Sequence, residues 1–173
     1  GKIAGKTVCQ LYMREFEDGE VLFLEPYRSR ALPVVRDLLV DRRALDRIVR
    51  AGAFVHSTDV DHPRPGQPGD SEGRTEPPPH CIECGACVAA CPNASAMLFA
   101  GARLKIVSGF HPGRTDRAQR AASISKQMDA EGFGSCSNHG ECEAVCPKGV
   151  AVPLIAELNA RYLSAILRGR AAR

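Results

Sequence analysis

Several features typical of large functional classes are scarce in this chain of 173 residues. It has no tryptophan, and aromatic residues make up only 5% of it. Proteins that bind single-stranded nucleic acid usually stack the bases on aromatic side chains. The formal net charge of +3 also gives little general attraction for a polyanion. We therefore do not expect nucleic-acid binding.

Long apolar runs are also missing. No stretch approaches the roughly 20 residues that a transmembrane helix needs, and the first residues contain no apolar signal core. We therefore expect a soluble chain in the cytoplasm that is free to dock on a membrane partner. The sequence opens with Gly1-Lys2-Ile3 instead of methionine, which suggests a chain that starts inside a longer protein.

The part of the chain before residue 81 is predicted to hold two strands and one helix. The strands are expected at 21–24 and 34–40, where β-branched and large apolar residues gather, with a helix as the alternative over 34–40. The helix is expected from about 41 to 51, capped by Asp41 and ended by Gly52. Its expected buried face consists of Leu45, Ile48 and Val49. Residues 56–80 contain six of the twelve prolines and predict an extended linker.

After residue 80 the apolar spacing becomes helical. Asn93 is predicted to cap a helix through residues 97–99, and Thr115 or Asp116 a helix from 117 to 130 that ends near Gly132. Pro153 fits the first turn of a last helix. The expected buried residues of these last two helices are Ala121, Ile124, Met128, Leu154, Ile155, Leu158, Tyr162 and Ile166.

Cysteine is the residue that stands out. Seven of the eight cysteines fall in two short runs, and the eighth is Cys9. The first run, Cys81 to Cys91 followed by proline, has the spacing C-x2-C-x2-C-x3-C-P. This is the spacing of bacterial ferredoxins, in which the fourth cysteine ligates the other cluster of a two-cluster pair. Such spacing favours a shared metal group over a disulfide framework.

The second run repeats the first with one cysteine missing. Its cysteines stand at positions 0, 6 and 10 counted from Cys136, and a proline follows the last of them. Position 3, which is Cys84 in the first run, is His139 in the second. The two runs therefore form an internal repeat from which one thiolate ligand has been lost.

If the last cysteine of each run ligates the neighbouring cluster, the ligands divide into a set of four and a set of three. Four thiolates suit a [4Fe–4S] cluster, and three suit a [3Fe–4S] cluster. The predicted [4Fe–4S] ligands are Cys81, Cys84, Cys87 and Cys146. The predicted [3Fe–4S] ligands are Cys91, Cys136 and Cys142.

Other interpretations of these residues remain open. Four cysteines can hold zinc, which would make the chain a zinc-stabilised interaction module, although this spacing is unusual for zinc. His139 can ligate a fourth iron, because imidazole ligates iron in some clusters. It can also pack over the cluster or donate a hydrogen bond to it. No residue of the chain is a candidate for substrate catalysis.

The two runs together resemble the iron–sulfur subunit of succinate dehydrogenase and fumarate reductase. The segment from Leu32 to Asp41 is similar to the one that joins the two domains in that family. The resemblance implies an α+β fold in three parts. Residues 1–41 would be the remnant of a β-grasp domain for a plant-type [2Fe–2S] cluster, with Cys9 as its last ligand. Residues 42–80 would be a helix and a linker, and 81–173 a mainly α-helical ferredoxin-like domain with two clusters.

The same resemblance implies a function and partners. The subunit would pass electrons between an FAD-containing flavoprotein and a membrane quinone, as a peripheral protein on the cytoplasmic side of the cell membrane. The stretch after Pro92 lacks the tryptophan that many members have at a ubiquinone pocket. It looks like the branch that uses a dihaem cytochrome b anchor and menaquinone. A two-cluster subunit of another respiratory dehydrogenase or reductase is the alternative, but such subunits carry two complete four-cysteine runs.

Overall fold

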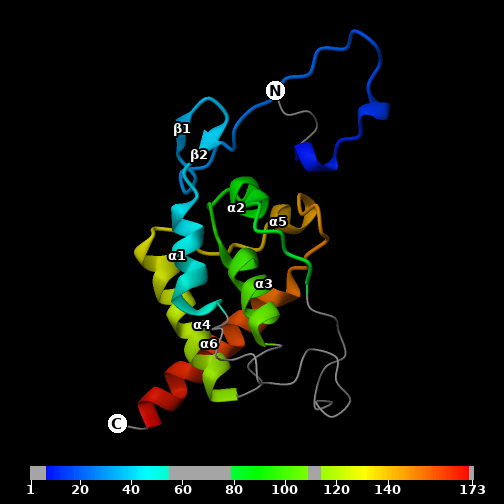
Figure 1. Cartoon of the computed structure of the whole chain (residues 1–173). Helices are drawn as coiled ribbons and strands as arrows, with labels where there is room; N and C mark the ends of the chain where they lie inside the picture. Colours follow the sequence, from blue (N-terminus) through cyan, green and yellow to red (C-terminus); the bar gives the residue numbers. More distant parts are fainter. Residues whose placement is uncertain (1–6, 55–78, 109–113, 172–173) are drawn as a thin grey trace.

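A computed structural model describes residues 7–54, 79–108 and 114–171 of the chain (Figure 1). The elements in order are the 3₁₀ turns η1 (Val8–Gln10) and η2 (Met13–Glu15), the strands β1 (Val34–Arg36) and β2 (Leu39–Val40), and the helices α1 (Arg43–Gly52), α2 (Ala86–Ala90), α3 (Met97–Ser108), α4 (Arg114–Ala130), α5 (Glu141–Ala144) and α6 (Pro153–Ala171). The described part is therefore mainly helical, as predicted for the second half. The proline-rich stretch 56–78 lies outside the described residues.

The segment before α1 has less regular structure than the sequence predicted. The strand expected at 21–24 is wrong, because these residues form neither a strand nor a bridge. Val21 and Phe23 are about 70% exposed, at 72% and 67%, so no packing surface supports an extended pair. The strand expected at 34–40 is instead a hairpin. Its chain reverses at Asp37, whose φ of 50° lies in the left-handed region, and β1 then pairs antiparallel with β2.

Four helices make the body of the molecule. The helix pairs α4–α6, α1–α4 and α3–α6 pack against one another, and α2 lies beside α5 above them (Figure 1). The main core joins residues of all four long helices with one residue from the segment before the hairpin. Its members include Leu32, Leu45, Ile48, Phe99, Leu104, Ile124 and Leu158. The helix before the linker thus shares its core with the region after residue 80.

Helix α1 lies within two residues of its predicted bounds, whereas α4 begins earlier than predicted. In α1, Leu45 and Ile48 are buried as predicted, and Asp41 accepts a hydrogen bond of 2.9 Å from the backbone N–H of Arg43. Gly52 is the last residue of α1 and lies so close to α4 that a Cβ would be 2.8 Å from the carbonyl oxygen of Arg120. Helix α4 begins at Arg114, so its predicted caps, Thr115 and Asp116, stand inside its first turn.

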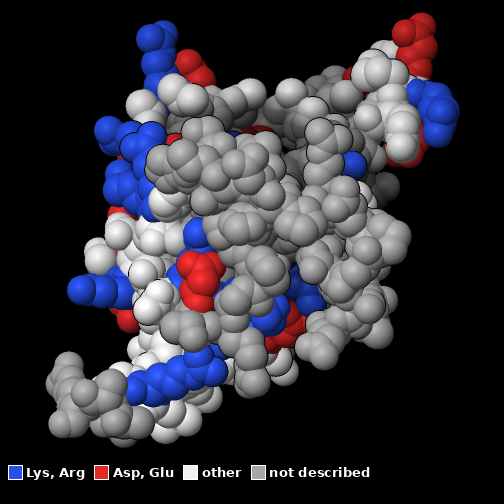
Figure 2. All heavy atoms as spheres, turned by 60° about the horizontal axis from the view of Figure 1, so that its bottom comes forward, with Lys and Arg blue, Asp and Glu red and all other residues white. Residues whose placement is uncertain are grey.

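The last helix follows the prediction closely. Helix α6 begins at Pro153, whose fixed φ suits a first turn. Leu154, Ile155 and Leu158 are buried, whereas Tyr162 and Ile166 are half-buried toward its free end. None of the helices in the described part of the chain is long and apolar enough to cross a membrane. Over the face shown in Figure 2, acidic and basic side chains lie next to one another, in keeping with the small net charge.

Candidate iron–sulfur site

The two cysteine runs share a backbone conformation as well as a spacing. Two positions in each run adopt positive φ, a conformation that few residues other than glycine favour. Glu83 and Asn138, each two residues after the first cysteine, have φ of 58° and 57°. Gly85 and Gly140, two residues further on, have φ of 80° and 81° and precede the short helices α2 and α5. The internal repeat is therefore present in the structure.

The match continues through the proline that follows each run. The carbonyl of Gly85 accepts a bond of 3.1 Å from Val88, and that of Gly140 accepts one of 3.0 Å from Glu143 at the equivalent position. Ala94 and Gly149 both have positive φ, 51° and 60°, and each donates its N–H to the carbonyl of the run's last cysteine. The last cysteine of each run is thereby carried away from its first three positions and toward the other run.

One cavity is lined by all four cysteines of the predicted [4Fe–4S] set. It has a volume of about 360 Å³. Cys81, Cys84 and Cys87 come from the first run, and Cys146 comes from the end of the second. The remaining wall is largely apolar and includes Leu98, Phe99, Ala102 and Val150. We call this hollow the four-cysteine cavity.

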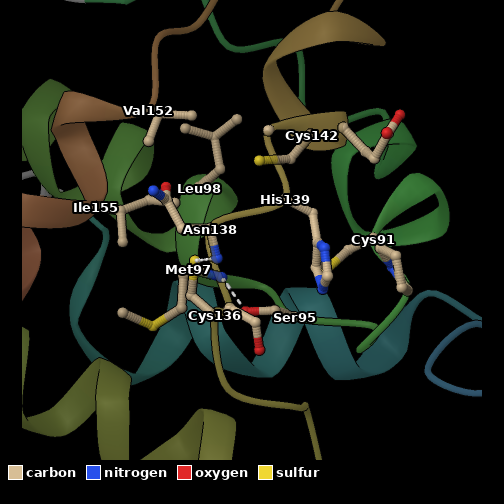
Figure 3. A pocket seen from close by; sticks show the side chains of 14 residues that line it. Cys91, Ser95, Met97, Leu98, Cys136, Asn138, His139, Cys142, Val152 and Ile155 are labelled. Atoms are coloured by element: carbon tan, nitrogen blue, oxygen red, sulfur yellow. Dashed lines mark hydrogen bonds between the residues drawn. The ribbon is translucent and has the colours of Figure 1, made fainter.

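A second cavity of about 380 Å³ is lined by the other three cysteines, and we call it the three-cysteine cavity. Cys136 and Cys142 come from the second run, and Cys91 from the end of the first. Figure 3 shows these three side chains around one hollow, together with His139. His139 takes the place that Cys84 has in the four-cysteine cavity, and its side chain is exposed.

The two cavities are neighbours. Leu98, on the first turn of α3, is 3% exposed and lines both of them. Leu98 is a member of a second buried apolar cluster, against which cysteines of both sets pack. That cluster consists of Leu98, Ala102, Val150, Leu154 and Ile155. The two cavities therefore share an apolar wall residue.

Burial makes the cysteine thiols difficult to ionise without a positive partner. It raises the pKa of Cys87 to about 12, with a further increase from Cys81, Cys84 and Cys142. It also raises the pKa of Cys81, where Arg103 acts in the opposite direction, and that of Cys142. Thiolates gathered in this way need bound cations to offset their desolvation and mutual repulsion. Iron in a cluster supplies that positive charge.

Backbone N–H groups are directed at the sulfur atoms. Asn138 donates to Sγ of Cys136 and Val150 to Sγ of Cys146, both at 3.4 Å. Glu83 makes the corresponding backbone bond to Cys81. Hydrogen bonds to sulfur are among the means by which proteins set cluster potentials. The donor set of both cavities therefore fits thiolate-bound iron–sulfur clusters.

The geometry suits a cluster better than a single ion. Zinc holds sulfur ligands about 2.3 Å from one centre. Within the described ranges, no three His, Cys, Asp or Glu side chains are grouped so as to hold one metal ion. Each cysteine set instead lines a hollow together with apolar side chains.

Two arginines that the sequence analysis missed support the first run. Arg103 of α3 makes an ion pair of 2.6 Å with Glu83, and its side chain is only 17% exposed. Arg42, just before α1, donates to the backbone carbonyl of Glu83. Arg103 also donates to the carbonyl of Ala53 at 3.3 Å. The charged residues within the mainly apolar helix α3, Arg103 and Lys105, were the available signal for such a role.

Asn93 has a different role from the predicted helix cap. Helix α3 begins four residues later, at Met97, whose N–H bonds to Oγ of Ser95 at 3.4 Å. The amide of Asn93 donates instead to the carbonyl of Ser135 at 3.1 Å and to Oγ of Ser137 at 2.7 Å. It therefore ties the end of the first run to the start of the second. Cys9 lies in η1, and its side chain is not among those that the structure describes.

Comparison with known proteins agrees with this geometry. Residues 79–150 match the family described as "4Fe-4S dicluster domain". The matched segment contains both cysteine runs, and with them all seven cysteines that line the two cavities. This segment is therefore similar to known 4Fe–4S dicluster domains. The region before residue 79 lies outside that match.

Several curated relatives have related names. The chain is 34% identical over 141 residues to a fumarate reductase (CoM/CoB) subunit of Methanothermobacter marburgensis, covering 80% of this chain and 27% of that protein. It is 33% identical over 142 residues to the succinate dehydrogenase iron–sulfur subunit of Bacillus subtilis, covering 79% and 55%. It is 25% identical over 152 residues to an Escherichia coli fumarate reductase iron–sulfur subunit, covering 84% and 59%.

Over about four fifths of its length, the chain is thus similar to subunits of fumarate reductase and succinate dehydrogenase. It spans between about a quarter and three fifths of the length of these relatives, at 27%, 55% and 59%.

Proposed function

We propose that this chain is an electron-transfer subunit of a succinate:quinone oxidoreductase of the succinate dehydrogenase and fumarate reductase type. The observation that carries the proposal is the arrangement of cysteines from both runs around two adjacent cavities. Iron–sulfur clusters accept and release single electrons over a wide range of potentials. A chain that holds two of them side by side provides the relay that such an enzyme needs.

The residues divide between the two clusters as follows. Cys81, Cys84, Cys87 and Cys146 would hold a [4Fe–4S] cluster in the four-cysteine cavity. Cys91, Cys136 and Cys142 would hold a [3Fe–4S] cluster in the three-cysteine cavity. Leu98 and its neighbours form a buried apolar cluster against both cysteine sets. Arg103, Arg42 and Asn93 fix the loops that carry the thiols.

The remainder of the functional proposal rests on homology. The partners would be an FAD-containing flavoprotein and a cytochrome b membrane anchor, on the cytoplasmic side of the membrane, with menaquinone as the quinone. Residues 1–41 would belong to a plant-type [2Fe–2S] domain of β-grasp fold, with Cys9 among its ligands. The domain divisions at 41/42 and 80/81 stay predictions, as does the role of Cys9. The names of the relatives support a place in a multi-subunit succinate dehydrogenase or fumarate reductase, and the finer points rest on the resemblance alone.

Metal analysis of anaerobically purified protein tests the proposal. We expect about seven irons per chain from one four-iron and one three-iron cluster, with about eight acid-labile sulfides. Low-temperature EPR of the oxidised protein should show a three-iron signal. Protein that contains zinc, but neither iron nor labile sulfide, would overturn the proposal and favour an interaction module.

A further inference from the structure

The position of the missing cysteine carries a further inference. Cys84 and His139 stand at the same place in two loops whose flanking residues have the same φ to within a degree, 58° and 57° before them and 80° and 81° after them. The backbone therefore presents the Cβ of His139 to the three-cysteine cavity in the way that it presents the Cβ of Cys84 to the four-cysteine cavity. His139 lines that cavity together with all three of its cysteines (Figure 3).

An imidazole at this place can reach what a thiolate reaches. Its Nδ1 is separated from Cβ by one ring atom, so a metal bound to Nδ1 lies nearly as close to Cβ as a metal bound to a cysteine sulfur. Neutral imidazole offers the lone pair of one ring nitrogen as a ligand, and histidine is an accepted ligand of cluster iron. Within the described residues, the protein atoms by themselves provide no site for a single ion. Binding at His139 would therefore require the sulfides of a cluster as the other ligands.

We propose that His139 is a conditional ligand for a fourth divalent metal ion, so that the three-iron site takes up and releases one iron. The inference rests on the proposed function, because it requires a [3Fe–4S] cluster in the three-cysteine cavity. The chemistry balances when an external reductant such as dithionite supplies one electron. The oxidised [3Fe–4S]⁺ cluster becomes [3Fe–4S]⁰, and this cluster then binds Fe²⁺ to give [4Fe–4S]²⁺. One iron–nitrogen bond forms at His139 and no protein bond breaks.

The surroundings of the two loops favour reversible binding at the second. His139 and its neighbours Ser137 and Asn138 are exposed, so a metal ion from solution can approach. Cys84, in contrast, is half-buried in a loop that two arginines hold. A single neutral imidazole also binds Fe²⁺ less strongly than a thiolate does, because it brings no negative charge. We therefore expect the cluster in the four-cysteine cavity to retain the iron bound to Cys84. The cluster in the three-cysteine cavity should exchange the iron bound to His139.

The experiment uses the purified, cluster-containing chain under anaerobic conditions. The protein is reduced with dithionite, given Fe²⁺, freed of excess metal and reoxidised gently, and the loss of the three-iron EPR signal is measured against added iron. We expect the signal to fall with the uptake of about one iron per chain and to return after chelation. In H139A the apparent affinity for the fourth iron should fall by more than about tenfold, the scale of loss seen even for outer-shell groups.

Two further variants serve as controls. His80, next to Cys81, is exposed and lines neither cavity, so H80A should behave like the unaltered protein. H139C should take the fourth iron without releasing it, because it restores the thiolate of the first run. Pulsed EPR of the reduced four-iron form, labelled with ¹⁵N-histidine, should show nitrogen coupling that disappears in H139A and persists in H80A.

The outcomes separate this inference from the proposed function. A three-iron signal that is unaffected by reduction and Fe²⁺ would overturn the role of His139 and leave the function intact. Equal iron uptake by H139A and the unaltered protein, or no nitrogen coupling, would also overturn it. Protein with zinc and no labile sulfide would overturn the proposed function, and the inference with it.

Discussion

The two cysteine loops have one backbone conformation but different supports. The first loop is held from outside by Arg42 and Arg103, both of which bind Glu83. The second loop has Asn138 at the equivalent position, and its cysteine Cys136 is exposed. The comparison teaches that the spacing of cysteines and left-handed residues shapes each loop, whereas residues distant in sequence decide how firmly it is held.

The second loop is held by hydrogen bonds to residues outside it, at Asn93 and Val152. Asn93 bonds to its first residues, and the carboxylate of Glu143 accepts a bond of 2.7 Å from the backbone of Val152 at the start of α6. Hydrogen bonds at exposed positions compete with water and contribute less than a partly buried ion pair such as that between Arg103 and Glu83. We therefore expect the second loop to change its conformation more readily than the first when a ligand residue is substituted.

The largest expected effect comes from removing the cysteine that one run contributes to the cavity of the other run. Cys146 belongs to the second run but lines the four-cysteine cavity. We expect C146A to lose the four-iron cluster and to retain a three-iron signal, with iron falling from about seven to about three per chain. Iron analysis and EPR provide the measurement. Its counterpart C91A should lose the three-iron signal and keep about four irons. The reverse pattern in either variant would show that each run holds its own cluster.

The next effect concerns the two helices that follow the loops. At Gly101 helix α3 lies close to α6, and a Cβ there would be 2.6 Å from the carbonyl oxygen of Leu154. G101A should therefore push the helices apart and lower the free energy of unfolding by about 2–3 kcal/mol. Chemical denaturation measures it.

A matched control lies on α6 itself. Gly169 lies in a helix, and a Cβ added to it would have nothing within 4 Å. G169A should raise the free energy of unfolding slightly, by about 0.5 kcal/mol, since alanine suits a helix better than glycine. Equal effects of the two variants would contradict the close approach of α3 and α6.

Much of the site could be predicted from local sequence, because the spacing of the cysteines along the chain indicates which of them can share a cluster. The runs, their repeat and the division of seven cysteines follow from positions along the chain, and the structure places the same sets around two cavities. Residues such as Leu98 and Arg103 could not be assigned in this way. Their roles depend on which helices meet, and the sequence alone does not specify the meeting of α3 with both loops.

The errors have a similar cause. Asn93 has the residue type of a helix cap, but its amide finds partners in Ser135 and Ser137, 42 and 44 residues away. The apolar residues at 21–24 have the composition of a strand, yet a strand needs a neighbour with which to pair. Local propensity gives the right answer only where tertiary contacts agree with it.

A smaller effect would weaken the support of the first loop alone. Replacing Arg103 by methionine removes the ion pair with Glu83, whose side chain is 38% exposed. Because solvent screens part of this pair, we expect a loss of only about 1–2 kcal/mol in the free energy of unfolding. Loss of the positive charge should also make the potential of the four-iron cluster more negative, while the three-iron cluster changes less. A redox titration followed by EPR measures both.

The control for this variant stands two residues away on the same helix. Lys105 pairs with Glu157 at 2.9 Å, further from the cysteine loops. K105M should cost about 0.5 kcal/mol or less and leave both potentials unchanged. Equal shifts of the two potentials in R103M would show that Arg103 acts on the whole domain instead of on the first loop.

The smallest expected effect concerns the start of α1, next to Arg42, which holds the first loop. Hydrogen bonds from Arg43 hold the pKa of Asp41 at about 2, well below its ordinary value, at the residue next to Arg42. A carboxyl group whose pKa is lowered in the folded state stabilises the protein above its unfolded pKa, and this contribution disappears as pH falls toward 2. R43A should raise the pKa of Asp41 toward 3.8, as an NMR titration of its side chain would show. Because Asp41 is at the surface, the change should leave the potential of the four-iron cluster unaltered, unlike R103M. A shifted potential in R43A would mean that the start of α1, and not only Arg103, sets how firmly the first loop is held.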